Sequence, residues 1–162
     1  MIFVGIDPGS TGGFATLDAS GRLLDAVALP TFGTETDGMS LAALLEAVAP
    51  ASDLFVGVES PFPNNRASSV AQLNQGTGYG IILGVLQAMH IRHERLRPLD
   101  WKTELRMPIG KKLTQADKKR ASRQRASQMW PDFADRWEKV SQDGIAEAAL
   151  IGEATRRRMV GS

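Results

Sequence analysis

Short apolar stretches separated by polar, glycine-containing turns predict a sheet in the first part of the chain. Three such stretches, residues 2–7, 13–17 and 23–29, follow one another closely, as antiparallel neighbouring strands do. Residues 53–58 are almost wholly apolar, which favours a central parallel strand buried on both faces. Residues 92–96 predict a fifth strand.

Longer segments between and after these strands predict helices. Ser40 and Thr114 precede two of them as candidate N-caps, and Pro50 and Pro131 follow the same two segments. The last helix is expected to fray at the arginines 156–158. The predicted helical segments are residues 40–48, 67–89, 97–105, 114–129 and 142–158.

The order of these elements predicts an α/β fold. Three consecutive strands followed by alternating helices and strands imply a five-stranded mixed sheet, antiparallel at first and parallel later, flanked by helices. A chain of 162 residues is long enough for one well-covered core. We therefore expect residues 1–162 to form a single domain.

Three glycines in the predicted helix 67–89 recur at every fourth residue and so share one face. Gly76, Gly80 and Gly84 lower helix stability, each by up to ~1 kcal/mol relative to alanine, which suggests that another segment approaches this face closely. A tight contact inside the same core and a dimer interface both fit the pattern.

Composition restricts the functional classes. The chain has no cysteine, which excludes disulfides and thiolate metal sites and is natural in a reducing cytoplasm. It lacks the ~18-residue apolar run that crosses a bilayer, so no membrane role is expected. Residues 1–90 carry a net charge of −6 and residues 91–162 a net charge of +7. A basic C-terminal half suggests a polyanion such as nucleic acid, although solvated helix surfaces also carry such charges.

Four carboxylates stand where the predicted elements could bring them together. Asp7 and Glu59 end two strands that we expect to be neighbours, and Asp143 and Glu147 lie four residues apart on one helical face. Close carboxylates repel one another unless cations neutralise them, and oxygen ligands favour Mg²⁺ or Mn²⁺. Each residue also has a simpler interpretation: Asp7 in a turn, Glu59 at a strand end, Asp143 as an N-cap and Glu147 in solvent.

Five short motifs occur in order along the chain: Gly5-Ile-Asp-Pro-Gly-Ser, Val58-Glu-Ser-Pro-Phe, Arg97-Pro-Leu-Asp-Trp-Lys, Asp117-Lys and Asp143-Gly-Ile-Ala-Glu-Ala. Together they resemble the RuvC-type Holliday junction resolvases, especially the small phage-like members of this branch of the ribonuclease H-like superfamily. The resemblance covers nearly the whole chain. It implies a homodimer that binds four-way DNA junctions and makes paired, metal-dependent nicks near the crossover, leaving 5′-phosphate and 3′-hydroxyl ends.

The same resemblance assigns roles by position. Asp7, Glu59, Asp143 and Glu147 would hold two Mg²⁺ ions, with Mn²⁺ as a substitute. Many relatives carry two Asp residues spaced by three on this helix, so it stays open which of Asp143 and Glu147 binds metal directly. Lys102 would approach the scissile phosphate.

Further residues are candidates for contacts with DNA. Phe62 resembles the aromatic residue that inserts at the junction in this family, although its proline neighbours also fit a packing role. The basic candidates for backbone contacts, which set affinity without reading sequence, are Arg66, Lys111, Lys112, Lys118, Lys119, Arg123 and Arg125.

Two other functions are compatible with parts of the sequence. Asp7-Pro-Gly-Ser-Thr-Gly also resembles the first phosphate loop of actin-like sugar kinases, but these enzymes need a second, related domain that 162 residues do not supply. A catalytically silent module that binds branched DNA is the other alternative. For the resolvase interpretation we expect no small-molecule cofactor and a location in the cytoplasm of a bacterial or phage-infected cell.

Overall fold

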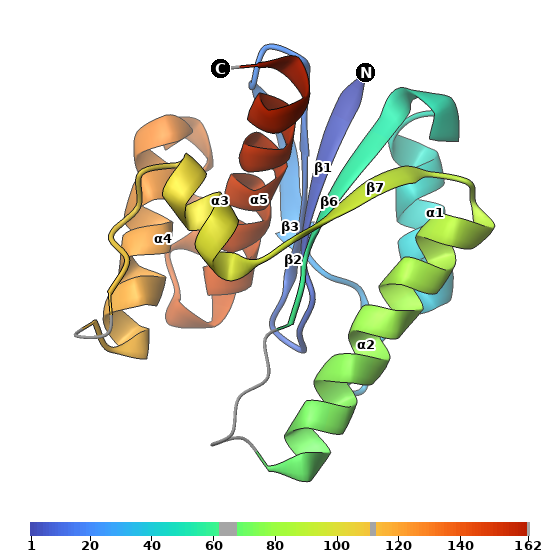
Figure 1. Cartoon of the computed structure of the whole chain (residues 1–162), viewed down its shortest axis with the longest axis horizontal. Helices are drawn as coiled ribbons and strands as arrows, with labels where there is room; N and C mark the ends of the chain where they lie inside the picture. Colours follow the sequence, from blue (N-terminus) through green and yellow to red (C-terminus); the bar gives the residue numbers. More distant parts are fainter. Residues whose placement is uncertain (62–67, 111–112, 162) are drawn as a thin grey trace.

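A five-stranded mixed sheet forms the centre of the protein in the computed structural model, which describes residues 1–61, 68–110 and 113–161 (Figure 1). Its strand order is β3-β2-β1-β6-β7. β2 pairs antiparallel with β1 and β3, whereas β6 pairs parallel with β1 and β7. The predicted sheet is thereby confirmed. The strands are β1 Ile2–Asp7, β2 Gly13–Leu17, β3 Leu23–Ala28, β6 Leu54–Glu59 and β7 Arg92–Leu96.

The parallel pairing of β1 and β6 places two of the candidate carboxylates at one end of the sheet. Ile6 lies opposite Val58 in this register, so Asp7 and Glu59 follow at the same end of adjacent strands. The prediction that their strands are neighbours is confirmed.

Helices cover both faces of the sheet (Figure 1). Successive side chains of a strand point to opposite faces, so Phe3 packs against α5 while Val4 and Ile6 pack in the cluster that includes Leu41 of α1. The fold therefore has three layers. Helices α3 (Pro98–Glu104), α4 (Gln115–Met129) and α5 (Asp143–Val160) lie on one side, and α1 (Gly38–Val48) and α2 (Ser69–Ala88) on the other.

Helix α5 lies unusually close to the strands because glycines replace side chains at the crossing points. A Cβ on Gly5 of β1 would overlap the Ala148 carbonyl, and one on Gly144 would overlap the Thr11 carbonyl. The first turn of α5 therefore rests directly on the loop that follows Asp7. This contact brings Asp143 and Glu147 to the sheet end that carries Asp7 and Glu59.

Some predicted element ends are wrong. Asp37, not Ser40, caps α1, because its side chain accepts hydrogen bonds from the backbone of Met39 and Ser40. Thr114 caps α4 as predicted, in a capping box with Asp117. The loop before α1 contains a small hairpin that no strand-length pattern indicated. Its strands are β4 Thr31–Phe32 and β5 Glu35–Thr36.

The prediction that the last helix frays at its arginines is wrong. Arg156 and Arg157 both donate to the buried Glu153, at 2.7 Å from each Nε. Burial raises the pKa of Glu153, but the hydrogen bonds from Arg156 and Arg157 outweigh it and the pKa is lowered. These ion pairs extend α5 to Val160.

The glycine face of α2 makes no close contact with the described residues of the other elements. A Cβ added at Gly76, Gly80 or Gly84 would meet no atom within 4 Å among the described residues. The interpretation of a tight contact inside the same core is therefore wrong. Within the described part of the chain, no helix combines the length and apolar character needed to cross a membrane.

Candidate active site

Three carboxylates from three elements interact at the end of β1 and β6. Burial raises the pKa of Asp7 well above its usual range, and the negative charges of Glu147 and Glu59 raise it further. Lys102 and Lys119 oppose this effect. Asp7, Glu59 and Glu147 thus form an acidic cluster, which we call the carboxylate cluster.

Glu59 is held by a hydrogen bond from a buried indole. Trp101, in α3, is fully buried and its Nε1 donates to Glu59 Oε2 at 2.6 Å. Burial raises the pKa of Glu59 to about 7, together with the charge of Glu147. The hydrogen bond from Trp101 and the charge of Lys102 act in the opposite direction. The indole therefore fixes this carboxylate and favours its charged form.

Lys102 reaches the same cluster from the next position of α3. Its Nζ lies 3.5 Å from Glu147 Oε1 and 4.7 Å from the centre of the Trp101 ring. The side chain is 18% exposed, so its charge acts in a partly desolvated place. The structure thus places Lys102 beside the carboxylate cluster, and its predicted approach to a scissile phosphate stays a prediction.

Glu147 and Asp143 have different surroundings despite their common helix face. Glu147 accepts a hydrogen bond from Ser122 of α4 at 2.8 Å, on the side of the cluster that Lys102 also contacts. Asp143 is 2% exposed and lies among the cations of α4. Arg123 Nε is 2.9 Å from its Oδ1, and Lys119 Nζ is 3.5 Å from its Oδ2.

The donor set fits a hard divalent cation, although the described side chains do not form a closed metal site. No three His, Asp or Glu residues are gathered closely enough there to coordinate one ion as they stand. However, both oxygens of Asp143 are buried without an aligned hydrogen bond to any described residue. Carboxylate oxygens of this kind are the ligands that Mg²⁺ and Mn²⁺ prefer.

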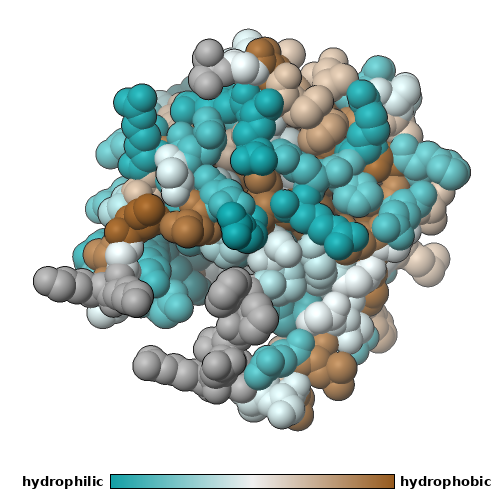
Figure 2. Space-filling model, viewed as in Figure 1, coloured by the Kyte–Doolittle hydropathy of each residue, from teal (hydrophilic) through white to brown (hydrophobic). Residues whose placement is uncertain are grey.

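The predicted DNA contacts divide into three groups. Lys118 and Lys102 line a cleft of about 360 Å³ together with the exposed apolar residues Leu99 and Ile109. Figure 2 shows apolar surface among the hydrophilic side chains on this face of the molecule. Lys119, Arg123 and Arg125 lie on α4, as Lys118 does, and the Nε of Arg125 is buried without a hydrogen bond to any described residue. Arg123 also donates to the backbone oxygen of Glu138 at 2.9 Å. Phe62, Arg66, Lys111 and Lys112 lie outside the described residues.

Two residues of the site were missed by sequence reasoning. A tryptophan by itself predicts a core or interface residue, and the position of Trp101 next to Lys102 is the available signal for a link to the site. Ser122 lies one helical turn after Lys118, so it shares a face with that lysine. Neither residue type indicates a carboxylate partner by itself, because the partner comes from a different element.

The mixed five-stranded sheet flanked by helices matches the RuvC-type, ribonuclease H-like fold. Solved structures that match the chain include two of RuvC from Thermus thermophilus. RuvC from Thermus thermophilus in complex with a Holliday junction substrate is 17% identical with a TM-score of 0.69, and a second T. thermophilus RuvC structure is 19% identical with a TM-score of 0.61. Each match covers 99% of this chain and 97% of the other. No family model and no curated protein matches the sequence.

Proposed function

We propose that this protein is an endonuclease that resolves four-way DNA junctions by paired, metal-dependent phosphodiester hydrolysis. The observation that carries the proposal is the carboxylate cluster, with Lys102 beside it, at the sheet end of a RuvC-type fold. The neighbouring T. thermophilus structure contains a Holliday junction substrate. The expected products have 5′-phosphate and 3′-hydroxyl ends, and residues 1–162 act as one nuclease domain.

Each side chain of the cluster has a role that its contacts support. Asp7 and Glu59 are held at adjacent strand ends, and the indole N–H of Trp101 keeps the Glu59 carboxylate oriented. Lys102 carries a positive charge at the edge of the cluster, where it can attract the scissile phosphate. Lys118 continues this positive charge along the cleft that it shares with Lys102.

Asp7, Glu59 and Glu147 are the residues that would hold two Mg²⁺ ions, or Mn²⁺ in their place. Bound ions of this kind activate water and stabilise the leaving oxygen of a phosphodiester. We propose Glu147 as the direct helix ligand, since it belongs to the cluster while Asp143 is paired with Arg123. Asp143 would join the site once Arg123 and Lys119 turn toward DNA.

A homodimer is the proposed functional unit. The first half of α2 projects beyond the sheet (Figure 1), and its outer face is exposed. Val70 and Leu73 are 67% and 68% exposed there, next to the open space over Gly76 and Gly80. A second copy of the helix could cover this apolar, small-residue face, which would place two active sites on one junction.

One observation favours the catalytically silent DNA-binding module as a second candidate. The pairing of Asp143 with Arg123 and Lys119 leaves no closed metal site among the described residues. Such a module would bind branched DNA and leave it intact. The phosphate-loop alternative has less support, because no charged side chain is found among the described residues that line the cavity beside the Asp7 turn.

The test is to incubate the protein with labelled four-way, three-way and linear duplexes, with and without Mg²⁺. The proposal predicts symmetric, Mg²⁺-dependent nicks confined to branched DNA, with religatable ends. Junction binding without nicks at any metal concentration would support the silent module. Equal cutting of the linear duplex would contradict the proposed substrate.

A further inference from the structure

A cavity of about 430 Å³ lies between the segment that follows α3 and the outer part of α4, and two arginines line it. Arg106 comes from the segment after α3, and Arg125 comes from α4. We call this space the arginine cavity. Pro108 lines both the arginine cavity and the cleft of Lys102 and Lys118, so the two spaces are neighbours. The arginine cavity therefore continues the basic cleft along α4.

Both guanidinium groups in this cavity lack a partner in the described part of the chain. Neither arginine side chain makes a hydrogen bond or an ion pair with a described residue, and the Nε of Arg125 is buried. The described lining contains no Asp or Glu, but it includes the carboxamides of Gln124 and Gln128. Guanidinium groups bind phosphate oxygens through paired N–H donors, and carboxamide N–H groups can add to them. The lining is therefore suited to a phosphate.

The backbone at Arg106 has a conformation that glycine normally adopts. Helix α3 ends in a Schellman motif, in which Arg106 N–H donates to the Thr103 carbonyl at 3.0 Å and Met107 N–H to the Lys102 carbonyl at 2.8 Å. The motif requires a left-handed residue, and the φ of Arg106 is 53°. A side chain in this region is unfavourable relative to glycine. An arginine that makes no contact of its own with the described residues is therefore explained better by a ligand than by the fold.

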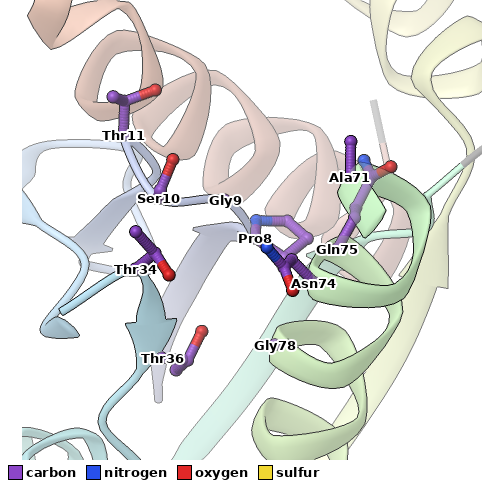
Figure 3. A pocket seen from close by; sticks show the side chains of 10 residues that line it. All are labelled: Pro8, Gly9, Ser10, Thr11, Thr34, Thr36, Ala71, Asn74, Gln75 and Gly78. Atoms are coloured by element: carbon purple, nitrogen blue, oxygen red, sulfur yellow. The ribbon is translucent and has the colours of Figure 1, made fainter. Parts of the chain in front are cut away.

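A second cavity, beside the turn after Asp7, has a different character. Its labelled residues, which include Ser10, Thr34 and Asn74, carry no charged side chain (Figure 3). A phosphodiester is negatively charged, and cations compensate this charge better than neutral hydroxyl and carboxamide groups do. The arginine cavity is therefore the better site for the backbone of bound DNA.

We propose that the arginine cavity binds one phosphodiester of a junction arm and fixes the position of that strand relative to the carboxylate cluster. The inference rests on the proposed function, because the strand reaches the cavity through the cleft of Lys102 and Lys118. Lys118 and Arg125 are two turns apart on one face of α4, which is about 10 Å along the helix. One strand of B-DNA advances about 3.4 Å per nucleotide. The bound phosphodiester therefore lies about three nucleotides from the one that faces Lys118.

The first experiment measures affinity for a four-way junction over a range of salt concentrations in EDTA, where no metal-dependent nick forms. At about 0.1 M salt, Arg106→Gly and Arg125→Gln should each bind roughly 5- to 20-fold more weakly, with a salt slope smaller by about one. The thermal midpoint of Arg106→Gly should not fall, because glycine suits this backbone. Arg92→Gln is the control, since Arg92 lies at the opposite end of the sheet from Glu59 and donates to the Ser52 carbonyl. It should keep the affinity and the slope of the wild type.

The second experiment locates the phosphodiester. A neutral methylphosphonate replaces one phosphodiester at a time within about six nucleotides of the crossover, so that each contact loses its charge separately. The wild type should lose affinity roughly 5- to 20-fold at a position about three nucleotides from the phosphodiester that Lys118→Ala identifies in the same scan. In Arg106→Gly that position should have an effect below about twofold, because the contact is already absent. Arg92→Gln should show the pattern of the wild type.

The outcomes separate this inference from the proposed nuclease activity, which is measured separately with Mg²⁺. A protein that nicks junctions while Arg106→Gly keeps the wild-type affinity and scan overturns the phosphate site and leaves the nuclease intact. A protein that nicks nothing, but whose scan loses one position in Arg106→Gly, supports the phosphate site and overturns the nuclease. Equal losses of affinity in Arg106→Gly and Arg92→Gln, or a lower thermal midpoint that accompanies the loss in Arg106→Gly, also overturn the site. A wild type without measurable junction affinity overturns both proposals.

Discussion

The side chains around Glu59 show how single contacts determine the chemistry of the site. An ionised carboxylate that is partly buried among other carboxylates is unfavourable, and it persists if hydrogen bonds and cations compensate. Trp101 supplies the hydrogen bond and Lys102 supplies the charge. Because both come from consecutive positions of α3, the placement of this short helix controls the state of Glu59.

Trp101→Phe removes the indole donor and retains an aromatic ring in the core. A hydrogen bond to a charged group contributes about 1.5–3 kcal/mol, so we expect the single-turnover nicking rate to fall roughly 10- to 100-fold. Trp137→Phe is the matched control, since Trp137 donates to Ser127 at 2.9 Å, away from the carboxylates. Trp137→Phe should lower the stability of the protein and leave its single-turnover nicking rate unchanged. Equal rate losses in both variants would show that Trp101 acts through packing alone.

The raised pKa of Glu59 predicts a dependence of stability on pH in metal-free protein. The folded state binds this proton more tightly than the unfolded chain does, so the associated stability is full below pH 4.5 and is lost as pH rises through about 7. The loss amounts to no more than roughly 3 kcal/mol. Urea unfolding at pH 5 and pH 8 in EDTA measures it.

The isosteric variant Glu59→Gln separates this effect from other titrations. It cannot ionise and keeps an acceptor oxygen for Trp101, so its stability should fall less between pH 5 and pH 8 than that of the wild type. The raised pKa of Asp7 also makes stability fall as pH rises, and it does so in both proteins. Parallel stability profiles for wild type and variant would argue against a raised pKa at Glu59.

At the scale of elements, the approach of α5 to the sheet assembles the site. The helix can lie this close because backbone atoms of Gly5 and Gly144 occupy positions where side chains would otherwise separate the layers. Asp143 and Glu147 reach the strand ends as a consequence. Stability and site geometry are therefore coupled through the same contact.

Gly144→Ala tests this coupling, because its Cβ would overlap the Thr11 carbonyl. We expect a loss of about 1–3 kcal/mol in the free energy of unfolding and a further loss of nicking in the protein that remains folded. Gly9→Ala is the control in the same loop, since its Cβ meets no atom closer than 3.9 Å. A fully stable Gly144→Ala protein would contradict the close packing.

The sequence was sufficient for the elements whose patterns are local. The strands β1, β2, β3 and β6 follow from apolar runs, and the start of α4 follows from its capping residue Thr114. The shared end of β1 and β6 follows from the order of the predicted elements, which makes these two strands parallel neighbours. The β4–β5 hairpin was not predicted, because strands of two residues have no detectable periodicity. The hydrogen bond from Trp101 to Glu59 was not predicted either, because it joins residues 42 positions apart that come together only in the packed fold.

At the scale of the whole molecule, the charge asymmetry and the exposed face of α2 belong to different surfaces. Five of the seventeen basic residues of the second half lie on α4, which borders the carboxylate cluster. Val70 and Leu73 lie on the projecting half of α2, where no described residue covers them. One surface is suited to DNA, and the other to a second copy of the chain.

Leu73→Asp tests the proposed dimer, because a charge on the apolar face of α2 would be costly to bury. Light scattering after gel filtration should show a dimer for the wild type and a monomer for the variant. Thermal unfolding of the variant monomer should remain cooperative, since Leu73 is 68% exposed. A wild-type monomer at all concentrations, or a dimer that persists in Leu73→Asp, would place the interface elsewhere or remove it.

The most direct test of the central claim, that the carboxylate cluster cuts junction DNA, is to measure binding and nicking by Asp7→Asn on the same four-way junction. Asp7 lies at the end of β1 and is not part of the basic surface, so junction affinity should stay within about threefold of wild type or rise through reduced repulsion. Mg²⁺-dependent nicking should fall about a hundredfold or more. Undiminished nicking by Asp7→Asn would contradict the account.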